Sequence, residues 1–313
     1  MRIDRRAVTG IAAILVAAAA VACGNATAGP AARHARSPAA HAPSFPLSHG
    51  FALGWYPAQS AQFDASAIDA LPVRPQVVNY YSGWTEGFNT SLAQSAYADG
   101  IETFVEMEPW NCGTGCDGKS VPAMTDIAAG VYDSYLIGFG QAIKAFGHPV
   151  LATFAHEMNG AWYPWGYGGS ENTTPAQWIA AWDHVVTVIN AQAPGLVTWV
   201  WAPNVEKFAV SVAQYWPGAR YVGVVGLDGY LSDDGATYQS EFGPTVADVR
   251  ALTSLPIWIS ETGVKQDASS AARLAALAEA ARRSGIRGLL YFDKGNFALP
   301  TDEEQALAKV IGH

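Results

Sequence analysis

The chain has 313 residues, of which 50% are hydrophobic and only 14% carry a charge. This length and composition are enough to bury a large core, in one large domain or two small ones. The net charge of −9 argues against a nucleic-acid-binding protein, because phosphate backbones are held by clustered Lys and Arg. Aromatic residues make up 12% of the chain, which is typical of enzymes for neutral sugars, whose rings stack on indole faces.

The N-terminal segment, residues 1–22, is predicted to be a signal peptide. It has three arginines among its first six residues, and its apolar stretch at 11–21 is too short to span a membrane. Ala20-Val21-Ala22-Cys23 resembles the cleavage site of bacterial lipoproteins, with Ala20 where Leu is usual. Ordinary cleavage after a nearby small residue is the alternative. We expect a secreted or extracytoplasmic protein, either tethered to the outer face of the cell membrane by a lipid on Cys23 or freely secreted.

Residues 23–48 are rich in Ala and Pro and are predicted to be a flexible tether, because such a composition cannot form a core. The folded domain is expected at 49–313. It contains Cys112 and Cys116 in a glycine-rich stretch, and export implies an oxidising compartment. We predict a short-range disulfide between them rather than a zinc site, since no His or further Cys lies nearby in the sequence to complete four ligands.

From residue 50 onward, short apolar runs alternate with longer amphipathic stretches. Eight runs rich in β-branched and aromatic residues are predicted to be strands, at 51–56, 76–81, 102–107, 150–155, 197–202, 221–227, 256–260 and 288–292. The spacing of apolar residues predicts helices at 175–193, 268–284 and 302–311. Helices after the fifth and sixth strands are weakly indicated. Trp178 and Trp182, one turn apart on a predicted helix, are expected to pack in the core.

This alternation predicts an α/β protein with a single (β/α)₈ TIM barrel. A doubly wound sheet is the alternative, but such a sheet usually carries a glycine-rich phosphate loop after its first strand. The sequence Gly54-Trp55-Tyr56-Pro57 is not such a loop, so the barrel is favoured.

The active site of a TIM barrel lies at the C-terminal ends of its strands. Carboxylate, amide and aromatic side chains recur after the predicted strands, at Tyr81, Trp84, Glu106, Glu108, Trp110, His156, Glu157, Trp162, Trp165, Asn204, Asp228, Tyr230, Glu261 and Asp293. Glu106 and Glu108 both follow the third strand, and we expect at most one of them to point into the barrel mouth. A purely structural barrel would not need this concentration of polar groups.

Two of these carboxylates, Glu157 and Glu261, suit glycoside hydrolysis. That reaction needs one protonated and one ionised carboxyl group across the scissile bond, roughly 5–5.5 Å apart in retaining enzymes. The two glutamates follow the fourth and seventh predicted strands, whose loops face the same barrel mouth. A zinc protease, the other chemistry that a His-Glu pair suggests, would need a second His where Gly160 stands.

Five motifs follow the fourth to seventh predicted strands. They are His156-Glu157-Met158-Asn159-Gly160, Trp162-Tyr163-Pro164-Trp165-Gly166, Trp201-Ala202-Pro203-Asn204, Gly226-Leu227-Asp228-Gly229-Tyr230 and Ile259-Ser260-Glu261-Thr262-Gly263. Together, and in this order, they resemble glycoside hydrolase family 26, which contains β-mannanases and some β-1,3-1,4-glucanases. The resemblance spans residues 50–295 and implies a TIM barrel with a retaining mechanism.

The resemblance also implies roles for individual residues. Glu157 matches the family's acid/base, and Glu261 matches its nucleophile. The residues matched beside this pair are His156, Trp162, Tyr230 and Asp228, of which the tyrosine is placed to hydrogen-bond the nucleophile. Many mannanases of the family carry an Arg where this chain has Thr153, so the resemblance leaves the substrate sugar open.

The two glutamates need opposite environments. We expect the rings of Trp162 and Trp165 to raise the pKa of Glu157, so that it keeps its proton near neutral pH. The hydroxyl of Tyr230 is expected to keep Glu261 ionised. The residues expected to bind the sugar are His156, Trp162, Trp165, Tyr230, Asp228, Trp110, Asn204 and Tyr81.

We therefore expect a retaining endo-β-glycoside hydrolase that acts on a plant or microbial polysaccharide, with β-1,4-mannan as the first choice. A β-1,3-1,4-glucanase is the alternative within the family. The chemistry requires no cofactor and no metal, and we expect a monomer with a polysaccharide as its partner and no nucleic acid. A non-catalytic glycan-binding lipoprotein would keep the barrel and the aromatic residues but would not need both carboxylates.

Overall fold

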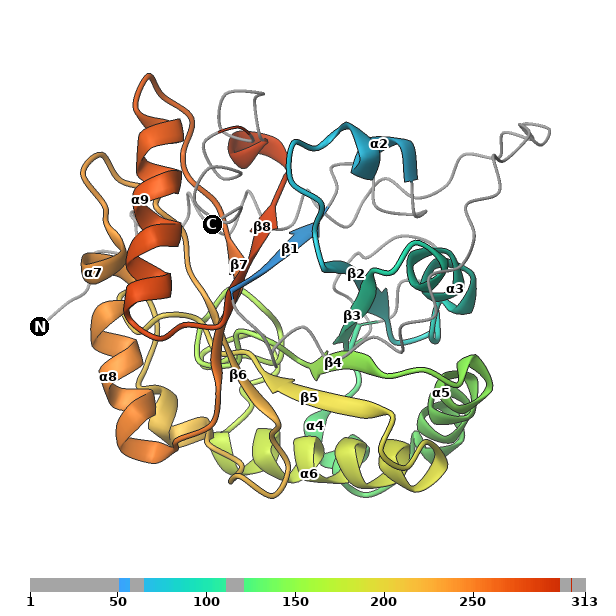
Figure 1. Cartoon of the computed structure of the whole chain (residues 1–313). Coiled ribbons are helices and arrows are strands. Elements are labelled where there is room, and N and C mark those ends of the chain that lie inside the picture. The colour runs from blue at the N-terminus through green and yellow to red at the C-terminus, as the bar shows by residue number, and fades with distance from the viewer. Residues whose placement is uncertain (1–50, 57–64, 111–120, 299–304, 306–313) are drawn as a thin grey trace, which may run out of the picture.

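The protein folds as a closed barrel of eight parallel strands, seen in a computed structural model that describes residues 51–56, 65–110, 121–298 and 305. The strands follow one another around the barrel in sequence order, and β8 pairs in parallel with β1 to close it (Figure 1). The predicted (β/α)₈ TIM barrel is therefore confirmed.

The bounds of the strands agree with the predicted apolar runs to within two residues, except that the sixth strand begins three residues later than predicted. Their bounds are β1 (Ala52–Tyr56), β2 (Val77–Gly83), β3 (Glu102–Glu108), β4 (Val150–Phe154), β5 (Val197–Trp201), β6 (Val224–Asp228), β7 (Ile257–Thr262) and β8 (Gly288–Phe292). Every residue of β4 and β8 is buried. Strands of a parallel sheet are covered on both faces, which explains their continuous apolar sequences.

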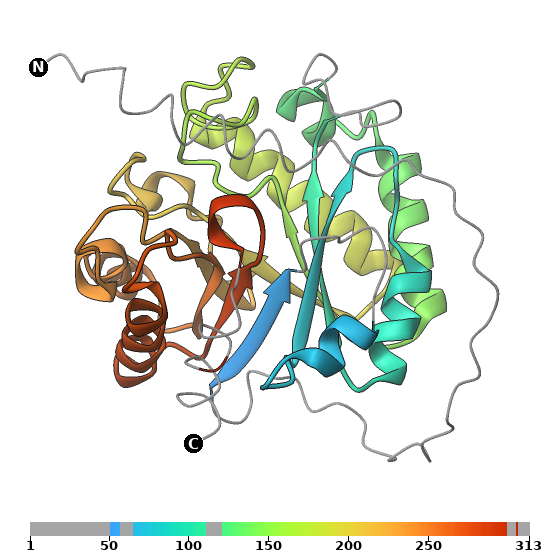
Figure 2. The ribbon, with the colours of Figure 1, turned by 90° about the horizontal axis from the view of Figure 1, so that it is seen from above.

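Helices surround the barrel, as Figure 2 shows from above. Their bounds are α2 (Ala65–Ala70), α3 (Thr90–Ala98), α4 (Met124–Ala128), α5 (Asp133–Phe146), α6 (Pro175–Gln192), α7 (Tyr238–Glu241), α8 (Gly243–Leu252) and α9 (Ser270–Arg283), with short 3₁₀ turns η3 (Val212–Tyr215) and η4 (Gly295–Phe297). The weakly indicated segment between β5 and β6 holds only η3. The predicted helices at 175–193 and 268–284 correspond to α6 and α9.

The longest helix, α6, begins with strong local signals. The Thr174 side chain and the Gln177 side chain form a reciprocal capping box, and Pro175 occupies the first turn. Trp178 and Trp182 on this helix are completely buried, as expected, and their rings stack at a centroid distance of 5.2 Å. Helix α6 is thereby fixed against the barrel beside the end of β4.

The barrel interior is filled by side chains rather than forming a channel. The indole of Trp258, on β7, is fully buried in this inner cluster. It fits because Gly288 begins β8: a Cβ added there would lie 1.9 Å from Trp258 Nε1 and 2.5 Å from the Ala52 carbonyl oxygen. Close packing at the bottom of the barrel therefore depends on this glycine.

Some predictions concern residues outside the described ranges. They are the signal peptide and tether at 1–48 with the lipid on Cys23, the disulfide between Cys112 and Cys116, and the helix at 302–311, of which only residue 305 is described. Within the described ranges, no helix has the length and apolar character needed to cross a bilayer.

Candidate active site

The chain makes an unusual turn directly after β4. Ala155 and Glu157 both adopt left-handed backbone conformations, with φ of 49° and 51°. Such conformations cost roughly 1–3 kcal/mol each outside glycine and persist where the surroundings hold them. The Trp178 indole donates to the Ala155 carbonyl at 3.1 Å, and the Glu157 amide donates to the Ala202 carbonyl at 2.7 Å. The turn therefore presents Glu157 at the C-terminal end of the barrel.

The carboxyl group of Glu157 is buried and receives a hydrogen bond on each oxygen. Asn204 Nδ2 donates to Oε1, and the Trp162 indole donates to Oε2. Asn204 is in turn held by Asn159: its backbone amide donates to Asn159 Oδ1 at 2.9 Å, and Asn159 Nδ2 donates to its carbonyl at 2.8 Å. The sequence placed Asn159 in a motif but gave it no role; its role is to position the Asn204 side chain.

Glu261, at the end of β7, is buried and held by two tyrosines. The Tyr81 hydroxyl donates to Oε2, and the Tyr230 hydroxyl donates to Oε1. The second contact agrees with the expected place of Tyr230. Tyr81 was expected only as a sugar contact, and the structure adds that its hydroxyl is bound to Glu261.

Both acids at the end of β3 lie near this site. Asn79 Nδ2 donates to Glu106 Oε1 at 2.6 Å, and the Trp110 indole donates to Glu108 Oε2 at 3.0 Å. Burial raises the pKa of both glutamates, and the charge of Glu261 adds to the shift. The expectation that at most one of them points into the mouth is wrong, because residues two apart on a strand share a face.

Asp228 lies at the end of β6 but does not hydrogen-bond either catalytic candidate. Its Oδ1 accepts from the Ser260 hydroxyl at 2.6 Å, and the side chain is fully buried. Burial, and next the charge of Glu261, raise the pKa of this carboxyl well above its usual value. Asp228 therefore holds the side chain of Ser260, the residue that precedes Glu261 in the chain.

Trp165 has no exposed surface, so it offers no face to a sugar, and its expected role as a sugar contact is corrected. Its ring stacks on Tyr163 with a centroid distance of 4.4 Å, and its indole donates to the His156 carbonyl at 2.8 Å. Trp110 packs edge-on against it at 5.2 Å. Trp162 remains partly exposed. Among the three tryptophans Trp110, Trp162 and Trp165, Trp162 is the one that is not buried, so it is the one whose surface a ligand can contact.

The surroundings act differently on the pKa values of the two glutamates. Burial, and next the charge of Glu261, raise the pKa of Glu157 to about 8. The hydrogen bonds from Asn204 and Trp162 act against this shift, so the Trp162 indole lowers the pKa rather than raising it as expected. Burial also raises the pKa of Glu261, but the hydroxyls of Tyr230 and Tyr81 lower it. The two hydroxyl donors therefore favour the ionised form of Glu261, whereas the pKa of Glu157 lies above neutral pH and favours its protonated form.

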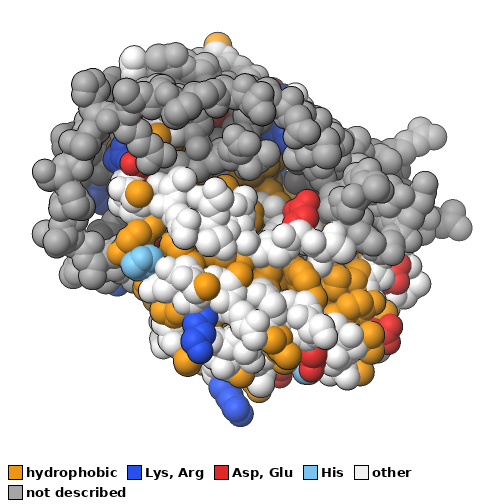
Figure 3. All heavy atoms as spheres, turned by 90° about the vertical axis from the view of Figure 1, so that its right-hand side faces the viewer, with side chains coloured by type: hydrophobic (Ala, Val, Ile, Leu, Met, Phe, Trp, Pro, Cys, Tyr) orange, Lys and Arg blue, Asp and Glu red, His pale blue; other side chains and the backbone are white. Residues whose placement is uncertain are grey.

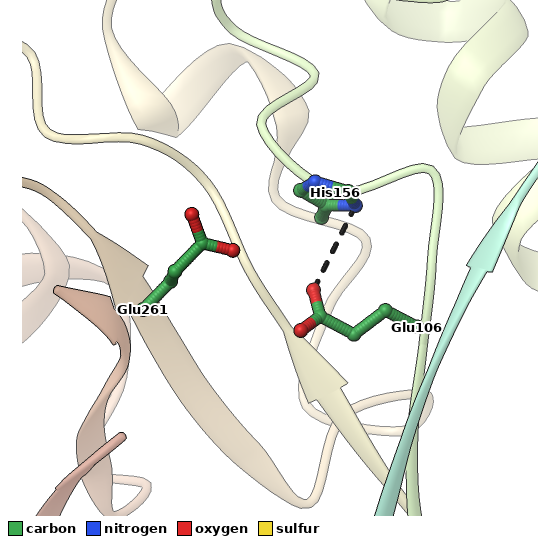
Figure 4. Close-up of side chains that lie close together, drawn as sticks. All are labelled: Glu106, His156 and Glu261. Carbon is green, nitrogen blue, oxygen red and sulfur yellow. Dashed lines mark ion pairs between the residues drawn. The ribbon is translucent and has the colours of Figure 1, made fainter. Parts of the chain in front are cut away.

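His156 lies close to both Glu106 and Glu261. Burial lowers its pKa to about 3, so the imidazole is neutral. Its Nε2 lies 3.1 Å from the Tyr163 hydroxyl, and its Nδ1 lies 3.8 Å from Glu106 Oε2. Figure 4 shows Glu106, His156 and Glu261 converging on one space. In the described parts of the chain, these three residues are the group whose ligand atoms, all within 4.8 Å of one another, could hold a metal ion.

The chain resembles known glycoside hydrolases in sequence and in fold. Residues 135–256 match the family described as glycosyl hydrolase family 26. Endoglucanase H of Acetivibrio thermocellus is 29% identical over 190 residues, which cover 59% of this chain and 20% of that protein. Mannan endo-1,4-beta-mannosidase A and B of Caldalkalibacillus mannanilyticus is 36% identical over 91 residues, which cover 28% of this chain and 17% of that protein. The chain thus spans a fifth or less of the length of these two curated relatives.

A solved structure extends the likeness in fold to most of the chain. A modular endo-beta-1,4-mannanase from Cellulomonas fimi superimposes with a TM-score of 0.63 at 17% identity, covering 83% of this chain and 70% of that chain. At this level of identity, the likeness shows the fold alone.

Proposed function

We propose that this chain, which belongs to glycoside hydrolase family 26, is a retaining endo-β-glycoside hydrolase with Glu157 as acid/base and Glu261 as nucleophile. One observation carries the proposal: Glu261 is a buried carboxylate with two hydroxyl donors, and burial, and next the charge of Glu261, raise the pKa of a second buried carboxyl, Glu157, to about 8. Glycoside hydrolysis requires this combination of an ionised and a protonated carboxyl group.

In the first step, Glu157 donates its proton to the glycosidic oxygen while Glu261 attacks the anomeric carbon. The leaving saccharide departs with the proton, and a covalent glycosyl ester forms on Glu261. Esterification removes the negative charge of Glu261, which is one of the causes that raise the pKa of Glu157. The pKa of Glu157 is therefore lower in the intermediate than in the free enzyme. Glu157 remains ionised until it takes a proton from the attacking water.

The donors around the two carboxyls support this cycle. Tyr81 and Tyr230 hold both oxygens of Glu261 and favour its ionised form. Asn204 and Trp162 hold both oxygens of Glu157, so its orientation is preserved when it changes from acid to base. The hydrogen bonds are present before substrate arrives, which reduces the reorganisation needed in the transition state.

β-1,4-Mannan is the substrate that we propose. Relatives named mannan endo-1,4-beta-mannosidase, from Caldalkalibacillus mannanilyticus and Bacillus subtilis, support it. A mixed-linkage β-glucan is the second candidate, because the A. thermocellus relative is named an endoglucanase and because Thr153 replaces an arginine common among mannanases. The side of the molecule that carries α3 and α5 shows hydrophobic side chains with a few charged ones among them (Figure 3).

We also propose that the protein is exported and held at the outer face of the cell membrane through Cys23. The basic start, the short apolar stretch and the Ala20–Cys23 sequence support this part of the proposal. Metabolic labelling with a fatty-acid analogue tests it: label should be incorporated in the native chain and absent after Cys23→Ser. Equal labelling of both would contradict lipidation at this residue.

The activity is tested by reducing-sugar release from mannan, lichenan, xylan and laminarin. Glu157→Gln should lower hydrolysis by roughly 10²–10⁴-fold, as expected for loss of a general acid/base. Glu102→Gln is the matched control, since Glu102 is a buried carboxyl on β3 whose pKa burial alone raises to about 8. It lies at the N-terminal end of the strand and should leave the rate unchanged. Wild-type rates in Glu157→Gln, or release from none of the four polymers, would contradict the proposal.

A further inference from the structure

A second property of the site concerns metal ions. Glu106, His156 and Glu261 come from β3, from the turn after β4 and from β7, and each places one ligand atom within 4.8 Å of the other two. All three side chains are at least 98% buried. Figure 4 shows them pointing toward one another across the barrel mouth. One imidazole and two carboxylates are side chains that commonly ligate zinc in proteins.

The ring nitrogen Nδ1 of His156, which faces Glu106, lacks a hydrogen-bond partner. His156 Nδ1 is buried and makes no hydrogen bond in the described structure, although it lies 3.8 Å from Glu106 Oε2. A buried polar nitrogen without a partner is costly, and it is an unusual feature of a native core. Depending on the tautomer, Nδ1 of His156 directs either a free lone pair or a free N–H at the carboxylate of Glu106.

The other ring nitrogen has the partner that a metal-binding histidine needs. His156 Nε2 lies 3.1 Å from the Tyr163 hydroxyl. Ligating histidines usually donate their second N–H to a neighbouring acceptor, which fixes the ring and the tautomer. When Nε2–H donates to the Tyr163 oxygen, the lone pair of Nδ1 points at the space between the two glutamates.

The carboxylates are also oriented from outside. Asn79 holds Glu106 Oε1 at 2.6 Å, which leaves Oε2 toward His156. The tyrosines on Glu261 use one lone pair of each oxygen, so acceptor capacity remains. Three ligands at zinc distances of about 2.0–2.2 Å would lie closer together than they do now, so binding draws the side chains inward by roughly an ångström.

We propose that Glu106, His156 and Glu261 form a binding site for Zn²⁺, and that Zn²⁺ bound there inhibits the enzyme by occupying the nucleophile. The ion's two positive charges balance two ionised glutamates around a neutral imidazole. A fourth position stays open to water, as in three-ligand zinc sites. Inhibition is competitive with the polysaccharide, because metal and anomeric carbon require the same carboxylate; this part rests on the function proposed above, whereas the binding does not.

Calorimetric titration of the full chain with ZnCl₂ tests the binding directly. Glu106→Gln and His156→Ala should each bind one zinc equivalent fewer than the native chain. Tyr163→Phe should keep the site but weaken it by roughly 10–100-fold, the cost of losing a partner that orients a ligand. The matched control is His184→Ala, because His184 pairs with Asp133 at 2.6 Å on the partly exposed surface of α6. It should leave the site intact.

Two results would overturn the proposal. One is equal zinc binding by the native chain and by Glu106→Gln, with circular dichroism showing that the variant is folded. The other is no zinc binding to the native chain at millimolar ZnCl₂. Steady-state kinetics on the preferred polymer should show that Zn²⁺ raises KM without changing kcat, and a fall in kcat alone would refute the inhibitory mode. Zinc binding in a chain that hydrolyses no polymer would sink the proposed function and leave the metal site standing.

Discussion

Removing one hydroxyl from the nucleophile's surroundings should shift the acid side of the pH–rate profile. Tyr81 and Tyr230 each donate to one oxygen of Glu261, and both hydrogen bonds lower the pKa of that carboxyl. Tyr81→Phe removes one donor while keeping the ring. Because the lost bond favoured the ionised form, the pKa of Glu261 rises, and the enzyme loses its nucleophile at a higher pH than before.

The size of the shift follows from the strength of the bond. A hydrogen bond to a charged group contributes roughly 1.5–3 kcal/mol, and one pKa unit corresponds to about 1.4 kcal/mol. The acid limb of kcat/KM should therefore move upward by about 1–2 pH units in either tyrosine variant. The alkaline limb, which reports loss of the Glu157 proton, should stay near pH 8, because the donors to Glu157 are untouched.

The assay is kcat/KM against pH for the native chain and for Tyr81→Phe and Tyr230→Phe. Tyr215→Phe is the control, because Tyr215 is a fully buried tyrosine whose hydroxyl has no hydrogen-bond partner in the described structure. It packs beside Trp178, away from Glu261. Acid limbs of both site variants that coincide with the native limb would refute the assigned role of the hydroxyls.

Three further predictions follow from other parts of the structure. The native kcat/KM should fall as pH rises through about 8, because Glu157 then loses the proton it must donate; activity undiminished well above that pH would show that another group is the acid. Asn159→Leu should lower kcat more than it raises KM, since it releases the amide that holds a donor to Glu157, and steady-state kinetics would measure the split. Gly288→Ala should destabilise the fold by about 1–3 kcal/mol in urea unfolding, because its Cβ would overlap Trp258, whereas Gly138→Ala, with open space around it, should be neutral or slightly stabilising. Equal unfolding midpoints for the two alanine variants would contradict the packing argument.

The strands and their order were predictable because each one is a short, continuous apolar run. Parallel strands covered on both faces leave this mark in the sequence, so the barrel and the places of Glu157 and Glu261 at its mouth could be predicted. Helix α8 was harder, because it opens with Gly243 and Pro244 and has few buried side chains to set a period. The segment between β5 and β6 forms only the 3₁₀ turn η3, so the sequence contained no helical pattern to detect there.

Side-chain contacts within the site were less predictable. The contact between Tyr81 and Glu261 joins residues 180 positions apart, and local spacing carries no information about it. The burial of Trp165 depends on how its loop folds back over His156, which a motif does not specify. The error over Glu106 and Glu108 has another origin. The alternation of a strand assigns residues two apart to one face, so both positions could have been placed together from the sequence.

The covalent intermediate offers the most direct test of the central proposal, that Glu261 is the nucleophile of a retaining hydrolase. The protein would be incubated with an activated 2-deoxy-2-fluoro-mannoside, which slows hydrolysis of the glycosyl ester, and then digested and analysed by mass spectrometry. We predict one glycosyl group per chain, attached to Glu261, and none in Glu261→Gln. A label on another residue, or an unlabelled enzyme that releases product of inverted configuration, would contradict the proposed mechanism.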